Sequence, residues 1–154
     1  MLLGFNTPCM SYIEFTKAYI HRLCRQIGTT ADSIYNEGTS SWYFSRGSST
    51  IEVFMTHPDG GEDPERVFLR CLAPICTLPS NPVALFELYR KALEINTRQM
   101  GIKLGTLESR GLLCLVAERD IEGMDYQEFV TMISDIGYWA DHYDNHLQGH
   151  DGKL

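Results

Sequence analysis

The spacing of apolar residues predicts three helices, of which the first covers residues 11–27. Apolar positions there recur every three or four residues, as on the buried face of an amphipathic helix. Ser11 can cap the start, because Glu14 follows three residues later and completes a capping box. Gly28 ends the pattern, as glycine commonly does after the last helical turn.

The second and third predicted helices lie further along the chain. Apolar residues cover a wide arc of residues 83–95, with Asn81 as the N-cap and Pro82 at the first helical position. After Asp125, apolar residues recur with a period of about 3.5 over more than two heptads. These residues are Phe129, Ile133, Ile136, Ala140, Tyr143 and Leu147.

Between the helices, stretches that alternate apolar and polar residues or are rich in aromatic residues predict strands. They are residues 41–46, 50–56, 66–73, 101–108 and 111–118. Short polar turns and the loop at 57–64 join the first three strands, and Ser109 with Arg110 joins the last two, which indicates hairpins. The stretch PICTLPSNP at 74–82 is expected to end the first run of strands.

The predicted order of elements is helix, three strands, helix, two strands, helix. Runs of strands separated by helices are typical of the α+β class, in which helices pack on an antiparallel sheet. We therefore predict one domain over residues 1–154, with a five-stranded antiparallel sheet and the order α-β-β-β-α-β-β-α. A chain of 154 residues is long enough to bury a core of its own.

The charge and composition of the chain indicate which kinds of partner it can bind. The net charge is -7 and the sequence pI is about 5.1. Such a surface repels phosphate groups, so we expect neither nucleic acid nor an anionic membrane as a partner. No apolar stretch is long enough to span a bilayer, and the first ten residues lack the basic start and apolar run of a signal peptide.

The cysteines indicate a reducing compartment. Their number is odd, and no two form a Cys-x-x-Cys pair, so we expect reduced thiols in a cytoplasmic protein. The five are Cys9, Cys24, Cys71, Cys76 and Cys114.

The stretch ERDIEGMDYQEFVTMI at 118–133 has the composition of a calcium-binding loop, but its register excludes one. With Glu128 as the twelfth and bidentate position, the first and third positions fall on Ala117 and Arg119, which offer no side-chain oxygen. Helix capping explains the acids better, with Asp125 as the N-cap and Glu128 three residues later.

Histidines are the remaining candidates for chemistry. His142 and His146 are four residues apart and can share a metal ion if the helix persists, but the same spacing also fits a solvated polar face. His57 lies in a loop with several acids, so an acid–base pair is conceivable. No phosphate-binding glycine loop and no nucleophile motif is present. We expect no enzyme, no metal and no cofactor; the alternative is a metal-dependent regulator or small enzyme that uses His57 or His142/His146.

The predicted helix at 83–95 has more apolar surface than one contact requires. A helix that is apolar over a wide arc must bury two surfaces, one on its own sheet and one on a partner. Our candidates for a dimer or partner interface are Leu85, Phe86, Tyr89 and Leu93. The alternative, that all four pack on the sheet of their own chain, stays open at this point.

The order of elements and three segments resemble the YbjN family, which shares its fold with the class I, CesT-like, type III secretion chaperones. The segment SSWYFSRGSSTIEVFM resembles the first YbjN hairpin, and LFELYRKALEINTRQMGIKLG resembles the central helix with its Leu-x-x-Asn ending at Leu93 and Asn96. The final strand, turn and helix, including Ala140, Asp141 and Asp144, are similar as well. The resemblance covers roughly residues 11–147.

Proteins of the fold that this sequence resembles are small, acidic and usually dimeric, so the resemblance implies a small acidic dimer. Secretion chaperones of this fold wrap an extended segment of a partner protein, using sheet edges and hydrophobic grooves. We therefore expect a non-enzymatic chaperone-like or adaptor protein that binds a segment of a partner protein as a homodimer. Fold-level analogy does not identify the partner.

Overall fold

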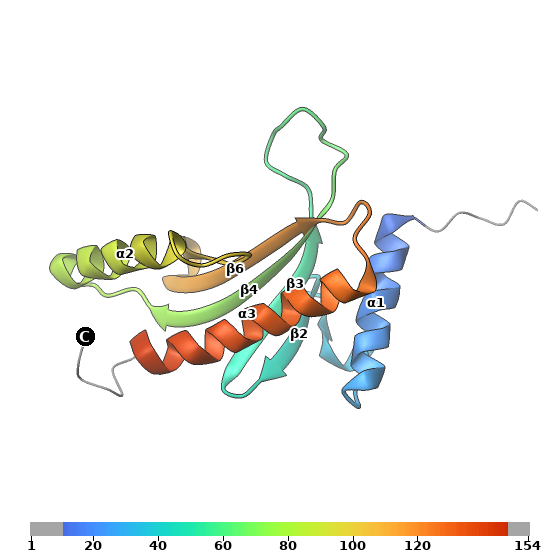
Figure 1. Cartoon of the computed structure of the whole chain (residues 1–154), viewed down its shortest axis with the longest axis horizontal. Helices are drawn as coiled ribbons and strands as arrows, with labels where there is room; N and C mark the ends of the chain where they lie inside the picture. Colours follow the sequence, from blue (N-terminus) through green and yellow to red (C-terminus); the bar gives the residue numbers. More distant parts are fainter. Residues whose placement is uncertain (1–10, 148–154) are drawn as a thin grey trace, which may run out of the picture.

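The computed structural model describes residues 11–147 as a curved antiparallel sheet with three helices (Figure 1). In chain order the helices and strands are α1 (Tyr12–Gln26), β1 (Tyr35–Asn36), β2 (Ser41–Arg46), β3 (Ser49–Thr56), β4 (Phe68–Thr77), α2 (Pro82–Asn96), β5 (Lys103–Leu107), β6 (Leu112–Asp120) and α3 (Tyr126–Leu147). Two short 3-10 turns, η1 (Asp32–Ile34) and η2 (Glu108–Arg110), precede β1 and β6. The α+β class and the antiparallel sheet are confirmed.

The predicted five-stranded sheet and its element order are wrong, because the sheet has six strands in the order β1-β2-β3-β4-β6-β5. The additional strand, β1, has two residues, which is too short to show an alternating pattern. Side-chain hydrogen bonds hold the turn that follows it: the Asn36 Oδ1 atom accepts from the backbone N–H of Gly38 at 2.8 Å and of Thr39 at 3.3 Å.

Strand β4 also runs four residues beyond the predicted end, through Pro74 to Thr77. Its pairing with β3 ends at Glu52 and Leu72, while its pairing with β6 continues to Thr77 and Leu112, with an irregularity just after Pro74. Proline is tolerated here because β3 no longer pairs with this part of β4, so the missing N–H removes no bond between β3 and β4.

Side-chain caps fix the helix starts as predicted. In α1 the Ser11 hydroxyl accepts from the Glu14 N–H at 3.3 Å, and the Glu14 carboxylate accepts from the Ser11 N–H at 2.8 Å. Before α3, Asp125 accepts from the Glu128 N–H at 2.8 Å and Glu128 accepts from the Asp125 N–H at 2.9 Å. The Asn81 side chain caps α2 in the same manner. Asp125 and Glu128 therefore cap the start of α3, which confirms the capping interpretation.

Helix α3 lies across one face of the sheet, and α1 packs against the start of α3 (Figure 1). The register places Val53, Cys71 and Ala117 side by side on this face, and all three are buried. Gly137 lets α3 approach closely, because a Cβ atom there would lie 2.8 Å from the Arg46 Cδ atom and 3.0 Å from the Ile51 Cδ1 atom. The α3-covered face is the main core.

The opposite face of the sheet carries ion pairs above a smaller buried cluster. Glu118 pairs with both Arg70 and Lys103. Glu52 is 6 % exposed and pairs with Arg110, whose Nη1 atom lies 2.8 Å from the Glu52 Oε2 atom. The buried apolar residues of this cluster are Leu72, Cys114 and Val116.

The buried Glu52 carboxylate predicts a pH dependence of stability. Burial disfavours its ionised form, but hydrogen bonds from Arg110 and Ser41 outweigh burial, so the pKa of Glu52 lies below its usual range. A carboxyl group whose pKa is lower in the folded state stabilises the fold above its unfolded pKa, about 4.3, and loses this contribution as the pH falls through the folded pKa.

We therefore expect Glu52→Gln to lower the free energy of unfolding by about 1–3 kcal/mol at pH 7. The difference from the wild type should shrink at pH 3, because this pH lies below the unfolded pKa, so the unfolded chain binds a proton that the folded Glu52 resists. Urea denaturation at the two pH values measures both differences. Glu87→Gln is the matched control, because Glu87 forms an exposed pair with Arg90. An equal difference at both pH values would contradict the role of the Glu52 charge.

Candidate protein-binding surface

Helix α2 exposes an apolar stripe that no part of the described chain covers. Only Ala92 of this helix is buried. Val83 is 73 % exposed, Phe86 65 % and Leu93 67 %, and we call these three residues the outer stripe of α2. Leu85 and Tyr89 are half-buried. The four predicted interface residues therefore divide into two exposed and two half-buried side chains.

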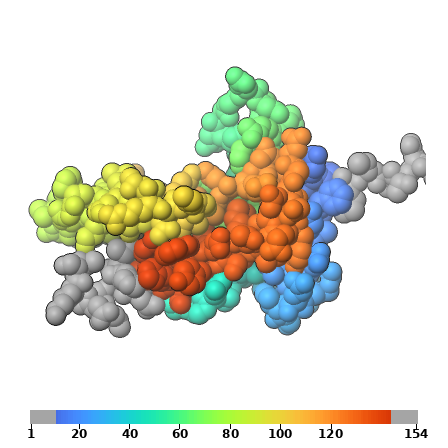
Figure 2. All heavy atoms as spheres, viewed as in Figure 1, coloured from blue at the N-terminus to red at the C-terminus, as the bar shows by residue number. Residues whose placement is uncertain are grey.

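The angular positions explain this division. With about 100° per residue, Leu85, Leu88 and Ala92 fall on one arc, while Phe86 and Leu93 fall on a neighbouring arc. Leu88 and Ala92 belong to the core cluster or pack against it, so the sheet takes up the first arc and leaves the second to solvent. In Figure 2, α2 forms one end of the molecule.

The C-terminal end of α2 is fixed to β5 by one side chain. Asn96 donates from its Nδ2 atom to the Leu104 carbonyl at 3.0 Å and accepts at Oδ1 from the Leu104 N–H at 2.7 Å. Strand β5 is at the edge of the sheet, and a cavity of about 320 Å³ lies between it and α2. Tyr89 and Leu93 line this cavity, so it continues the apolar surface of the helix.

The other edge of the sheet is open along β2. Strand β1 pairs only with Ser41 and Trp42, and no described residue pairs with the outer edge of the rest of β2. Arg46 and Ser49 flank the two-residue turn at Gly47, whose φ of 56° suits the first position of a type II′ turn. Arg46 and Ser49 therefore form a hydrogen-bonded pair in that hairpin.

Because backbone direction alternates along a strand, the N–H and C=O groups of Tyr43 and Ser45 then point away from β3. Both residues lie in the part of β2 that β1 does not reach. The sheet thus presents two strand positions to an incoming extended segment. The sequence pattern contains no signal for this open edge, because the edge is open only as a result of β1 being two residues long.

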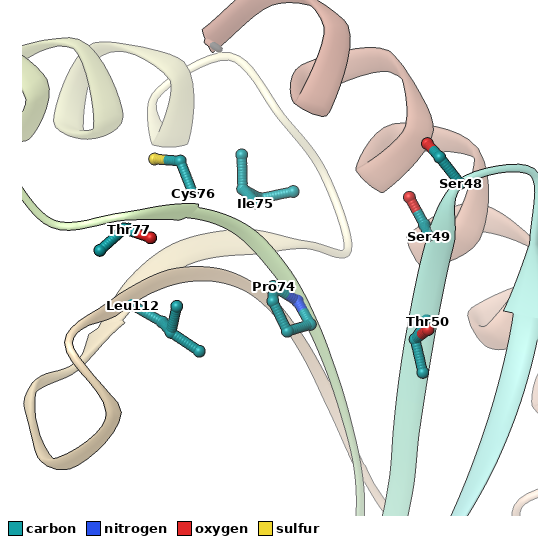
Figure 3. Close-up of a pocket in the computed structure, with 8 residues that line it drawn as sticks. All are labelled: Ser48, Ser49, Thr50, Pro74, Ile75, Cys76, Thr77 and Leu112. Carbon is teal, nitrogen blue, oxygen red and sulfur yellow. The ribbon is translucent and has the colours of Figure 1, made fainter.

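A cavity of about 520 Å³ lies where β3 and β4 diverge (Figure 3). It is bordered by Ser48, Ser49 and Thr50 on one side and by residues 74–77 with Leu112 on the other. Among the described residues, its lining combines hydroxyl groups with apolar side chains and the Cys76 thiol.

His57 lies at the base of the loop between β3 and β4. The His57 Nδ1 atom lies 3.0 Å from the Arg66 carbonyl oxygen, so the ring joins the two ends of the loop between β3 and β4. Asp59 lines the same small cavity as His57, but no hydrogen bond or ion pair within the described residues joins the two.

His142 lies in an aromatic cluster on α3. Its ring stacks on Tyr138 with a centroid distance of 6.4 Å, and meets Trp139 at 5.4 Å and Tyr143 at 5.3 Å. The side chain of His146 lies outside the described residues. Among those that are described, no three histidine, cysteine or acidic side chains come together as metal ligands would.

Four cysteines lie among the described residues. Cys24, Cys71 and Cys114 are buried and form no disulfide, and Cys76 is half-buried. Cys9 lies outside the described residues. Between residues 11 and 147, no helix has the length and apolarity to cross a bilayer.

Comparison with solved structures shows the fold that the sequence resemblance led us to expect. A chain of the ExsC–ExsE complex superposes with a TM-score of 0.64 at 12 % identity, over 88 % of this chain and 96 % of that one. A chain of the HopA1–SchA chaperone–effector complex superposes with a TM-score of 0.58 at 15 % identity, over 90 % and 99 %. The chain therefore shares the fold of these two chains.

Sequence comparison does not assign the chain to a protein family. No protein-family model matches the chain, and no curated protein matches it. Membership of the YbjN family is therefore not confirmed, and the likeness to the two complexes is one of fold.

Proposed function

We propose that this protein is a non-enzymatic, chaperone-like protein that binds an extended segment of a partner protein in the cytoplasm. The observation that carries this proposal is the open outer edge of β2, in a fold shared with a chain of a chaperone–effector complex. Backbone hydrogen bonds to Tyr43 and Ser45 would add the segment to the sheet as a strand. This mode needs no metal or cofactor.

The acidic surface supports a protein partner rather than a nucleic acid. A net charge of -7 repels phosphate groups and attracts basic polypeptide segments. Strand addition uses the backbone of the partner and requires little of its sequence, so the charge would supply part of the selectivity.

We also propose that the outer stripe of α2 joins two copies of the chain. Phe86 and Leu93 are seven residues apart, which places them on one face of the helix. If two α2 helices cross antiparallel on a two-fold axis near Tyr89, Phe86 of each copy meets Leu93 of the other. The cavity between α2 and β5 would accept further apolar side chains at the same contact.

Ser45 provides a sharp test of strand addition. The side chain of Ser45 is exposed, and its N–H points away from β3, so Ser45→Pro removes one outward donor and leaves the β2–β3 hydrogen bonds in place. Losing one backbone donor in the complex costs about 1–3 kcal/mol, which weakens partner binding by roughly tenfold to a hundredfold.

Ser45→Ala is the matched control, because it changes the same side chain and keeps the N–H. The measurement is the amount of partner protein that each tagged variant retains from extracts of the native host, followed by calorimetry with the isolated partner. Equal retention by Ser45→Pro and Ser45→Ala would reject the β2 edge as the binding site.

A further inference from the structure

Arg110 crosses the uncovered face of the sheet to reach Glu52. It lies in η2, the turn between β5 and β6, and Gly111 with a φ of 63° closes that turn. In the sheet order, only β4 lies between this hairpin and β3, so the contact from the β6 side of the turn spans about 10 Å across two strand spacings. The Arg110 Nη1 atom lies 2.8 Å from one Glu52 carboxylate oxygen, and the Nη2 atom 3.5 Å from the other.

Glu52 is a fixed anchor for this contact. Its side chain is 7 % exposed, and its Oε1 atom accepts from the Ser41 hydroxyl at 3.0 Å. Arg110 is 47 % exposed and belongs to a short turn, so it is the movable partner. The ion pair therefore opens when the turn that carries Arg110 moves away from Glu52.

Cys114 lies under this ion pair. The register aligns Glu52 with Leu72 and aligns Pro74 with Cys114 on the same face of the sheet. Cys114 is 0 % exposed, and burial raises the pKa of its thiol to about 11, while the nearby Arg110 charge acts in the opposite direction. Cys71 is equally buried but faces α3, on the other side of the sheet.

The same turn continues into the unit that carries α2. Strand β5 ends at Leu107, immediately before η2, and Asn96 bonds β5 to the end of α2 through Leu104. Glu108, in η2, lines the cavity between α2 and β5. Covalent and hydrogen-bonded links therefore connect Arg110 to the outer stripe of α2.

We propose that the Glu52–Arg110 pair is a strap that holds the β5–α2 unit against the central sheet and shields Cys114. Opening the strap releases this unit while the α3-covered core stays folded. The strap thereby controls how firmly α2 is presented for self-association, a role that rests on the proposed dimer. The shielding of Cys114 does not depend on the dimer.

The test is the rate at which iodoacetamide alkylates each cysteine of the full chain, resolved by peptide mass spectrometry. In Arg110→Gln, which keeps most of the side-chain length, we expect alkylation of Cys114 to accelerate at least about tenfold, because local opening becomes easier. Alkylation of Cys71 should not change. Arg98→Gln, which removes an exposed ion pair with Glu94, is the matched control.

Three outcomes decide the proposal. Acceleration at Cys114 alone supports the strap. Equal acceleration at Cys71 and Cys114 means that the variant loosens the whole fold, and it overturns the strap, as does an unchanged rate at Cys114. Glu52→Gln opens the same pair by changing the acid, and it must accelerate alkylation of Cys114 more than that of Cys71, whose rate reports the global destabilisation expected for this variant. Light scattering on these variants reports self-association separately, so a monomeric wild type would reject the dimer and leave the strap standing.

Discussion

Phe86→Asp is expected to convert the protein from a dimer to a monomer. Phe86 is 65 % exposed, so the isolated fold does not need it, whereas the proposed two-fold contact buries it in both copies. Burying an unpaired carboxylate costs several kcal/mol, and the symmetric contact would bury two of them, one from each copy. The dissociation constant should therefore rise by at least about 1,000-fold, since each tenfold corresponds to about 1.4 kcal/mol.

Light scattering coupled to size exclusion, over a range of protein concentrations, measures this change directly. Ile27→Asp is the matched control, because Ile27 is 57 % exposed but lies at the end of α1. It should stay dimeric. A wild type that remains monomeric at high concentration, or a Phe86→Asp variant that still dimerises, would reject the outer stripe of α2 as the interface.

Phe129→Ala is expected to cost about 3–5 kcal/mol of unfolding free energy, because it leaves a cavity in a fully buried site. The Phe129 side chain is 0 % exposed, and its ring lies 6.0 Å from Tyr19 of α1 and 6.2 Å from Tyr126 of α3. A domain of this size is stable by only about 5–15 kcal/mol, so the loss is a large share of the total. Urea denaturation followed by circular dichroism measures it.

Thr131→Ala on the same helix provides the control for this change. Thr131 is exposed, and its hydroxyl contacts only the Gln127 side chain among the described hydrogen bonds. Its replacement should change the unfolding free energy by less than about 0.5 kcal/mol. A loss below 1 kcal/mol for Phe129→Ala would mean that α1 and α3 do not share the packing described.

The helices and strands that were predicted correctly are those determined by interactions between residues close together in the sequence. The capping box at Ser11 and Glu14 and the cap at Asp125 involve residues three positions apart, so the printed sequence contains the whole interaction. The β2–β3 hairpin is similar, because Gly47 fixes the turn and alternating residues fix its two faces. The order of the longer elements follows from such signals.

The missed features depend on residues far apart in the chain. Strand β1 forms only because β2 offers it a partner, and β4 passes through Pro74 only because β3 has already diverged. A strand of two residues and the point at which two strands separate produce no periodic pattern of apolar residues in the sequence. The number of strands was therefore predicted wrongly although the fold class was right.

The exposed surface of α2 was predicted only in part, because it too depends on contacts between residues far apart in the chain. The wide apolar arc of α2 indicated two buried faces, but the sequence could not show which residues the sheet already covers. Phe86 and Leu93 prove to be exposed, while the exposed Val83 was not named. The Glu52–Arg110 pair spans 58 residues, and its only sequence signal is an acid between two inward-facing apolar residues of β3.

The composition of the complex formed in the native host tests the central claim most directly. The tagged chain should be isolated gently from that host and its assemblies weighed by native mass spectrometry. We predict two copies of the chain together with a protein partner, from which limited proteolysis leaves one short protected segment. A single copy of the chain with no protein partner would contradict it.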